Sequence, residues 1–191
     1  MIYNIPNTLS LFRIALIPCL VLVYYVPEQS LPIELKNVVA TIIFVVAAIT
    51  DWLDGYLARK LKQTSKFGAF IDPVADKLII IAALLILVDL GRLDVLIGLI
   101  IIGREFAVSA LREWMATLGK SGGIAVAFIG KLKTTMQMIA ILFLLYYENI
   151  LFVPVAAVGK ILIYIAALLT MISMIYYLKI AFKILKKNKD Y

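Results

Sequence analysis

The chain has 191 residues, 64% of them apolar, and it carries a formal net charge of +7 with no histidine and one cysteine. Soluble domains rarely approach this apolar fraction, so the composition excludes an ordinary soluble protein and predicts a single membrane domain over residues 1–191. The absence of histidine excludes Ser-His catalysis and the usual zinc sites. Cys19 cannot form an intrachain disulfide, and we expect it to be a small packing residue.

The apolar residues form six runs, each long enough to cross the hydrocarbon core of a bilayer as a helix. The sequence therefore predicts an all-α integral membrane protein with six transmembrane helices. The expected spans are residues 8–26, 35–62, 69–90, 93–114, 131–147 and 153–179. We expect Gly68 to lie in the loop before the third span and a basic tail to follow Lys179.

Basic residues are concentrated on one side of this predicted arrangement. With six spans the two termini share a side, and the tail and the two links on that side hold most of the lysines and arginines. The opposite side has only Lys36, Arg92 and Lys160, together with five acidic residues. The positive-inside rule then places both termini in the cytoplasm. This placement explains the net charge without nucleic acid, which we do not expect as a partner.

Four carboxylates, those of Asp51, Asp54, Asp72 and Asp76, lie in or beside the second and third apolar runs. Each acidic residue at the bilayer centre costs roughly 2.5–3.5 kcal/mol, so the group needs compensating partners. The spacings i, i+3 and i, i+4 place each pair on one helix face. Such oxygen ligands suit one or two hard cations such as Mg²⁺ or Mn²⁺. The alternatives are ion pairs with Arg13, Arg59 or Lys77, or a path for protons or cations.

The stretch from Asp51 to Asp76 also contains a longer pattern with fixed gaps. The pattern comprises Asp51, Asp54, Gly55, Ala58, Arg59, Gly68, Asp72 and Asp76. All eight positions resemble the signature of the CDP-alcohol phosphotransferase family. That resemblance implies a membrane enzyme that moves a substituted phosphoryl group from a CDP-linked donor to an alcohol. It also implies six helices around a polar cavity that faces the cytoplasm, and a homodimer in the cell membrane.

Three further stretches are similar to one branch of that family, in which CDP-diacylglycerol donates a phosphatidyl group to glycerol 3-phosphate. They are residues 4–18, 104–120 and 130–138. The resemblance implies that Asp76 is the catalytic base and that all four aspartates bind metal. It implies a donor site formed by Asp51, Asp54, Gly55, Ala58, Arg59 and Gly68, with Asn7 and Arg13 of the first helix. Ser10 stands where threonine is more usual in the branch.

A second basic group follows in the fourth and fifth spans. Arg104 and Arg112 are eight residues apart, close to one helix face, and Lys131 and Lys133 open the fifth span. Arginines beside a metal site are suited to an anionic acceptor, so these four residues are expected to bind its phosphate. Alternatively, Arg104 pairs with Glu105 or with the aspartates, and the lysines are ordinary cytoplasmic flanks.

Two other functions remain open at this point. A relative in the same family could use another acceptor, such as serine, inositol phosphate or phosphatidylglycerol. A divalent-cation or proton-coupled transporter could use the same aspartates as its path, although no internal repeat is visible.

Overall fold

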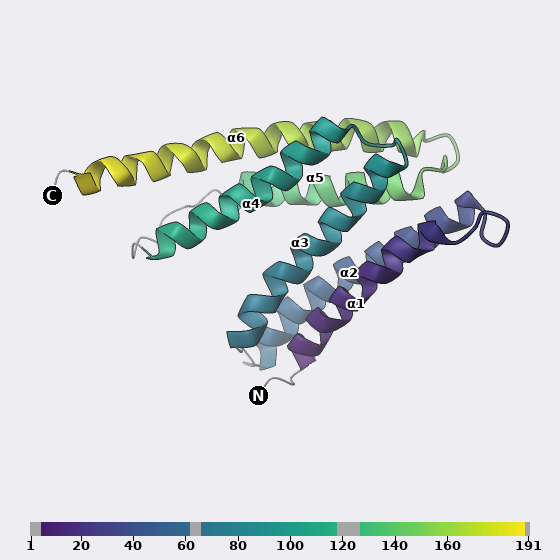
Figure 1. Ribbon diagram of the computed structural model, residues 1–191, viewed down its shortest axis with the longest axis horizontal. Helices are drawn as coiled ribbons and strands as arrows, with labels where there is room; N and C mark the ends of the chain where they lie inside the picture. Colours follow the sequence, from purple (N-terminus) through teal and green to yellow (C-terminus); the bar gives the residue numbers. More distant parts are fainter. Residues whose placement is uncertain (1–4, 62–65, 118–126, 190–191) are drawn as a thin grey trace.

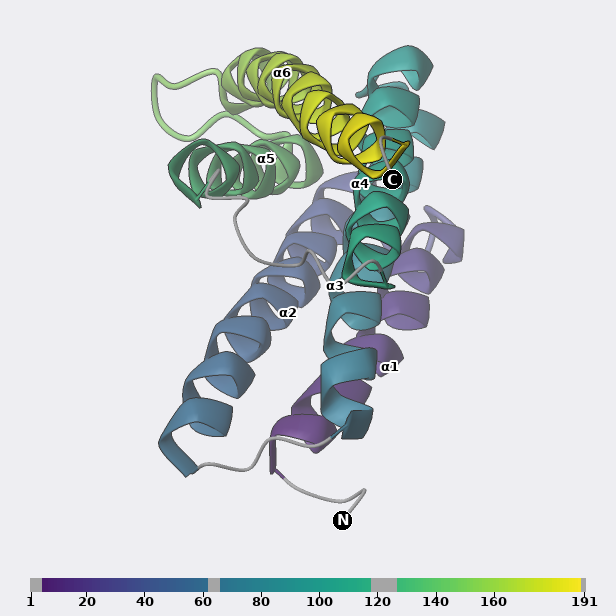
Figure 2. The same ribbon diagram turned by 90° about the vertical axis from the view of Figure 1, so that its left-hand side faces the viewer.

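The computed structural model describes residues 5–61, 66–117 and 127–189, and this part of the chain is built from six α-helices. Their bounds are α1 Ile5–Tyr25, α2 Ile33–Leu61, α3 Lys66–Asp89, α4 Val95–Thr117, α5 Ala127–Tyr146 and α6 Val155–Lys189. Helix α1 packs on both α2 and α3, while α6 packs on α4 and α5 (Figure 1). The helices thus form two groups, α1 to α3 and α4 to α6. Contacts between α2 and α5 and between α3 and α4 join these groups (Figure 2).

The helix ends divide between two sides of the molecule. The starts of α1, α3 and α5 and the ends of α2, α4 and α6 lie toward the left of Figure 1. The other ends are joined by short connections toward the right of the same view. Neighbouring helices in the chain therefore run in opposite directions, as the predicted membrane topology requires.

The connection between α3 and α4 shows how local sequence sets these reversals. Gly91 adopts a φ of +66°, which glycine reaches without the steric penalty of a side chain. Asp94 then caps α4, because its Oδ1 accepts a hydrogen bond of 2.8 Å from the backbone N–H of Leu96. The chain thus turns from one helix into the next within five residues.

Three helices contain segments long and apolar enough to cross a membrane: Asn7–Tyr25, Ile33–Asp54 and Val155–Lys179. Helices α3 and α4 are as long as a span, but every stretch of 18 residues in them includes at least three charged side chains. Within α5, the segment Lys133–Tyr146 is a shorter apolar helix. Large apolar side chains within these segments, such as Leu22 and Leu168, are exposed, as is typical of helix faces that contact lipid. The described part of the chain is all-helical, and its apolar helices are those of a membrane protein.

The apolar core lies where the two groups of helices meet. Leu20, Phe44, Leu84 and Ile141 come from four different helices and are almost completely buried. Gly159 lets α6 approach α5 closely, since a Cβ there would lie 3.0 Å from Cβ of Phe143. The close packing fixes the distances between the helices that carry charged residues.

A buried arginine, Arg92, connects helix ends on the side of the bundle where α3 is joined to α4. Arg92 is 6% exposed, and its Nη1 donates 3.0 Å hydrogen bonds to the backbone oxygens of both Leu144 and Leu145. Its Nη2 donates to Oδ1 of Asn37 at 2.8 Å, and its guanidinium lies 4.2 Å from the ring centroid of Tyr147. The backbone oxygens at the end of α5 have no helical partners of their own, so Arg92 completes that helix end and ties it to α2.

Several sequence-based expectations differ from this structure. Helix α3 begins at Lys66, so Gly68 lies buried in its first turn and not in a loop, because a shorter polar link than predicted suffices. Helix α6 continues to Lys189 where a tail after Lys179 was predicted, since lysine and leucine are good helix formers also outside the bilayer. Cys19 is exposed on α1 and does not pack in the core. For α3 and α6 the polarity pattern located the apolar segment but not the helix end.

Candidate active site

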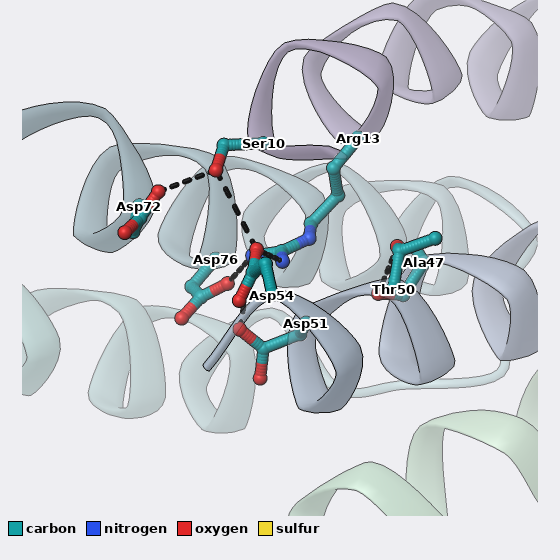
Figure 3. A network of polar contacts seen from close by, with 8 residues as sticks. All are labelled: Ser10, Arg13, Ala47, Thr50, Asp51, Asp54, Asp72 and Asp76. Atoms are coloured by element: carbon teal, nitrogen blue, oxygen red, sulfur yellow. Dashed lines mark hydrogen bonds and ion pairs between the residues drawn. The ribbon is translucent and has the colours of Figure 1, made fainter. Parts of the chain in front are cut away.

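Carboxylates from two helices meet beside the first turns of α1. Asp51 and Asp54 lie in α2 before its last two turns, and Asp72 and Asp76 lie near the start of α3. Figure 3 shows all four side chains directed toward the face of α1 that carries Ser10 and Arg13. The structure therefore brings together the two predicted acidic pairs.

The guanidinium of Arg13 lies among three of these carboxylates. Its Nη1 lies 3.0 Å from Oδ1 of Asp51 and also contacts Asp76, while Nη2 contacts Asp54 (Figure 3). Arg13 is fully buried and Asp54 nearly so, whereas the side chains of Asp51 and Asp76 are 50% and 42% exposed. One of the alternatives above, an ion pair between Arg13 and the aspartates, is thus present. A single positive charge still leaves the four carboxylates with a large excess of negative charge.

Helix α1 contributes two more polar groups on the same face. Ser10 donates a hydrogen bond to Asp72 and lies 3.5 Å from Oδ2 of Asp54 (Figure 3). Asn7, Ser10 and Arg13 follow one another at intervals of three residues, and all three are buried. This spacing keeps them on one side of the helix, the side on which Ser10 and Arg13 contact the acidic cluster.

The donor set fits a divalent cation by its chemistry, because it consists of carboxylate and hydroxyl oxygens. Within the described residues, no group of three or more carboxylates is arranged as a metal site. The guanidinium of Arg13 lies between the carboxylates and supplies positive charge there. A cation that binds the aspartates must therefore compete with Arg13 for their oxygens.

A cavity of about 330 Å³ opens beside this cluster. Arg13, Asp51 and Asp76 line one part of it, and Glu105 of α4 and Gln137 of α5 line another. Much of the remaining wall is apolar, including Phe44 and Ile101. The cavity is thus a mostly apolar space with charged groups on two sides, which is typical of small-molecule sites.

Two of the four predicted acceptor-binding residues meet at Glu105. Lys133 Nζ lies 2.5 Å and Arg104 Nη1 3.0 Å from Oε1 of Glu105. Arg104 also donates a 2.9 Å hydrogen bond to Oγ of Ser173 on α6. Arg104 and Lys133 are both buried, so their charges are held in fixed positions beside the cavity. The pairing of Arg104 with Glu105, which the sequence left open, is confirmed.

The remaining predicted residues can be placed only by their helices. Gly55, Ala58 and Arg59 belong to the end of α2, Arg112 to the end of α4 and Lys131 to the start of α5. Their side chains lie outside the described part of the structure. Gly68 is buried in the first turn of α3, close in sequence to Asp72.

Four polar residues at the cavity or beside it were missed by the sequence analysis as functional candidates. Glu105 was considered only as a partner of Arg104, and Thr134, Gln137 and Ser173 were not considered. A signal was available for Gln137, because it is an amide in an apolar helix, four residues after Lys133 and hence on the same face. Ser173 gave no such signal, since serine is common in membrane helices.

Comparisons with known proteins agree with this arrangement. The family profile described as CDP-alcohol phosphatidyltransferase matches residues 3–184. A CDP-diacylglycerol–glycerol-3-phosphate 3-phosphatidyltransferase of Haemophilus influenzae is 50% identical over 182 residues, which is 94% of each chain. Enzymes with the same name from Shigella flexneri and Escherichia coli K12 are 47% and 46% identical, over 94% of this chain and 95% of theirs.

Proposed function

The chain belongs to the CDP-alcohol phosphatidyltransferase family, and from this premise we propose that it transfers the phosphatidyl group of CDP-diacylglycerol to glycerol 3-phosphate. The products are phosphatidylglycerol phosphate and CMP. One observation carries the proposal: the aspartates of the family signature converge from α2 and α3 beside a cavity whose other side carries Glu105. Glu105 in turn pairs with two buried cations, Arg104 and Lys133. This arrangement offers separate places for a pyrophosphate and for an anionic acceptor.

In the proposed reaction the oxygen of the primary hydroxyl of glycerol 3-phosphate attacks the β-phosphorus of the donor. The bond between that phosphorus and the oxygen of the CMP group breaks, and CMP leaves with the bonding electrons. Asp76 accepts the hydroxyl proton, a role supported by its partly exposed side chain on the cavity wall. For this step Asp76 must be released from its contact with Arg13.

The carboxylates of Asp51, Asp54, Asp72 and Asp76 are proposed to hold two divalent cations, Mg²⁺ or Mn²⁺. When bound, these cations neutralise charge on the pyrophosphate and on the leaving CMP. Arg13, which now pairs with three of the carboxylates, is then available for the donor phosphates. The other residues proposed for the donor site are Asn7, Gly55, Ala58, Arg59 and Gly68.

The phosphate of the acceptor is proposed to bind the basic residues on the other side of the cavity. Arg104 and Lys133 are both paired with Glu105, which lines this side. Arg112 lies near the end of α4 and Lys131 near the start of α5, the helix ends that we propose to face the cytoplasm. An incoming phosphate dianion competes with the Glu105 carboxylate for the same two cations. Buried cations favour a doubly charged partner, because little water screens them.

The proposed setting is the cell membrane, with all six helices spanning it and both termini in the cytoplasm. The excess of basic residues on one side supports this orientation. It places the acidic cluster where nucleotides and Mg²⁺ are available, and it lets the basic end of α6 meet anionic lipids. A homodimer is proposed from the family resemblance.

The test is CMP release by the purified protein with CDP-diacylglycerol and Mg²⁺, offering glycerol 3-phosphate, serine, inositol phosphate and phosphatidylglycerol separately. We expect release only with glycerol 3-phosphate, its loss on chelation, and a decrease of roughly 10²–10⁴-fold in Asp76→Asn, because the base is removed. Asp89→Asn is the matched control, since Asp89 is an exposed residue at the far end of α3.

Each other outcome has a definite meaning. Release with a different acceptor keeps the family chemistry and overturns the proposed acceptor. A folded protein that binds divalent cations but releases no CMP with any acceptor overturns the enzymatic proposal in favour of cation transport.

A further inference from the structure

Helix α5 contributes a buried polar side chain to the cavity wall, and the proposed function gives this side chain no role. Gln137 is 2% exposed and lines the cavity. Within the described residues, the oxygen of its side-chain amide has no hydrogen-bond partner. A buried amide oxygen without a partner is unfavourable, so a ligand or a water molecule must donate a hydrogen bond to it.

Gln137 lies one helical turn from a residue proposed to bind the acceptor. Lys133 and Gln137 are four residues apart, so they share a face of α5 and are separated by about 6 Å along its axis. A three-carbon chain and its ester oxygen reach about as far as one helical turn, about 5.4 Å. A phosphate held at Lys133 therefore places the carbon chain of the acceptor beside Gln137.

The reacting end of the acceptor then meets the carboxylates. Asp51 and Asp76 line the same cavity as Gln137, as does Glu105, which holds Lys133. Thr134 of α5 also lines the cavity, but it is an exposed residue directly after Lys133, whereas the amide oxygen of Gln137 is buried without a partner. The neighbours Ile101, Ile102 and Met138 are apolar. An amide at this position can accept a hydrogen bond from a hydroxyl and donate one to it.

We infer that Gln137 is a specificity-determining residue, whose side-chain amide binds the secondary hydroxyl of glycerol 3-phosphate. The inference rests on the proposed function. It adds a residue that recognises the secondary hydroxyl, which is adjacent to the primary hydroxyl that reacts. An acceptor that lacks this hydroxyl leaves the amide oxygen buried without a partner. Sites that hydrogen-bond a substrate hydroxyl reject the analogue without it for this reason.

The test compares glycerol 3-phosphate with 3-hydroxypropyl phosphate, which has the same length and phosphate but no secondary hydroxyl. We expect the unmodified protein to prefer glycerol 3-phosphate by about tenfold or more in kcat/KM, the value of one good hydrogen bond. In Gln137→Leu we expect kcat/KM for the two acceptors to differ by less than about twofold. The substitution lowers kcat/KM for glycerol 3-phosphate alone, because only this acceptor has the secondary hydroxyl. Gln137→Glu keeps an acceptor for the hydroxyl proton and should restore part of the preference.

Met138→Leu is the matched control, since it changes the neighbouring lining residue without removing a polar group, and it should keep the full preference. An equal loss for both acceptors in Gln137→Leu would assign the residue a structural role and overturn the inference. Equal use of the two acceptors by the unmodified protein would also overturn it, and this comparison needs no variant to fold. A water molecule alone at Gln137 predicts that same equality. Failure of the unmodified protein to use glycerol 3-phosphate at all would instead overturn the proposed function.

Discussion

Two buried arginines lie toward opposite ends of the helices and have partners of opposite kinds. Arg92 donates to two backbone oxygens and an amide and lies over an aromatic ring, all of them neutral groups. Arg13 contacts the carboxylates of Asp51, Asp54 and Asp76. Both residues are almost fully buried. Burial of an arginine therefore does not distinguish a structural role from a functional one, but the charge of its partners does.

The difference follows from the balance of charge at each arginine. At Arg92 neutral acceptors of the protein satisfy the guanidinium by hydrogen bonds, and a stable end of the bundle requires no additional ligand. At Arg13 one cation faces four carboxylates, so the group retains negative charge that only further cations can neutralise. The first arrangement is complete within the protein, whereas the second requires ligands.

Removing Arg92 should have the largest effect on stability. Arg92→Met leaves the backbone oxygens of Leu144 and Leu145 without their donor, and we expect a loss of about 2–4 kcal/mol in the free energy of unfolding. Thermal or denaturant unfolding in detergent measures this loss. Under conditions in which Arg92→Met is still folded, its kcat and KM should remain close to those of the unmodified protein. Lys160→Met, which removes an exposed cation from the same side, should leave stability unchanged. A loss of turnover in folded Arg92→Met would contradict the assignment of a structural role to Arg92 and a functional role to Arg13.

Removing Arg13 should instead change cation binding. Arg13→Met takes a competing positive charge from the proposed metal ligands, so we expect Mn²⁺ to bind about tenfold more tightly or better. Calorimetric or spectroscopic titration with Mn²⁺ measures the affinity without turnover. Arg92→Met is the matched control, because it removes the same side chain at the other end and should leave the affinity unchanged. Equal Mn²⁺ affinity in the two variants would mean that Arg13 does not compete with the cation.

The smallest expected effect is at Ser10. Ser10→Ala removes the hydroxyl that bonds Asp72, and we expect about a fivefold loss of turnover, equivalent to about 1 kcal/mol. Ser10→Thr keeps the hydroxyl and should retain most of the activity. Steady-state CMP release compares the two variants. Similar losses in both would point to packing at α1 and away from the hydrogen bond to Asp72.

The helices and the acidic cluster could be predicted from the sequence, because both depend on short-range patterns. Apolar runs located all six helices, and the spacing of the aspartates placed each pair on one face. The positions of helix ends depend on chain outside the bilayer, so the start of α3 at Lys66 and the extension of α6 to Lys189 were missed. The convergence of Lys133 and Arg104 on Glu105 depends on the packing of α4, α5 and α6. Sequence spacing does not encode contacts between separate helices.

The outward position of Cys19 has a practical consequence. It is the only thiol in the chain, and it lies on the exposed face of α1, six residues after Arg13. In a bilayer this face meets acyl chains, so a membrane-permeant maleimide should reach the thiol while a charged one is kept away. One fluorophore or spin label can therefore be attached without first removing other cysteines. Such a label would report on movement of the helix that carries Arg13 when nucleotide or cation is added.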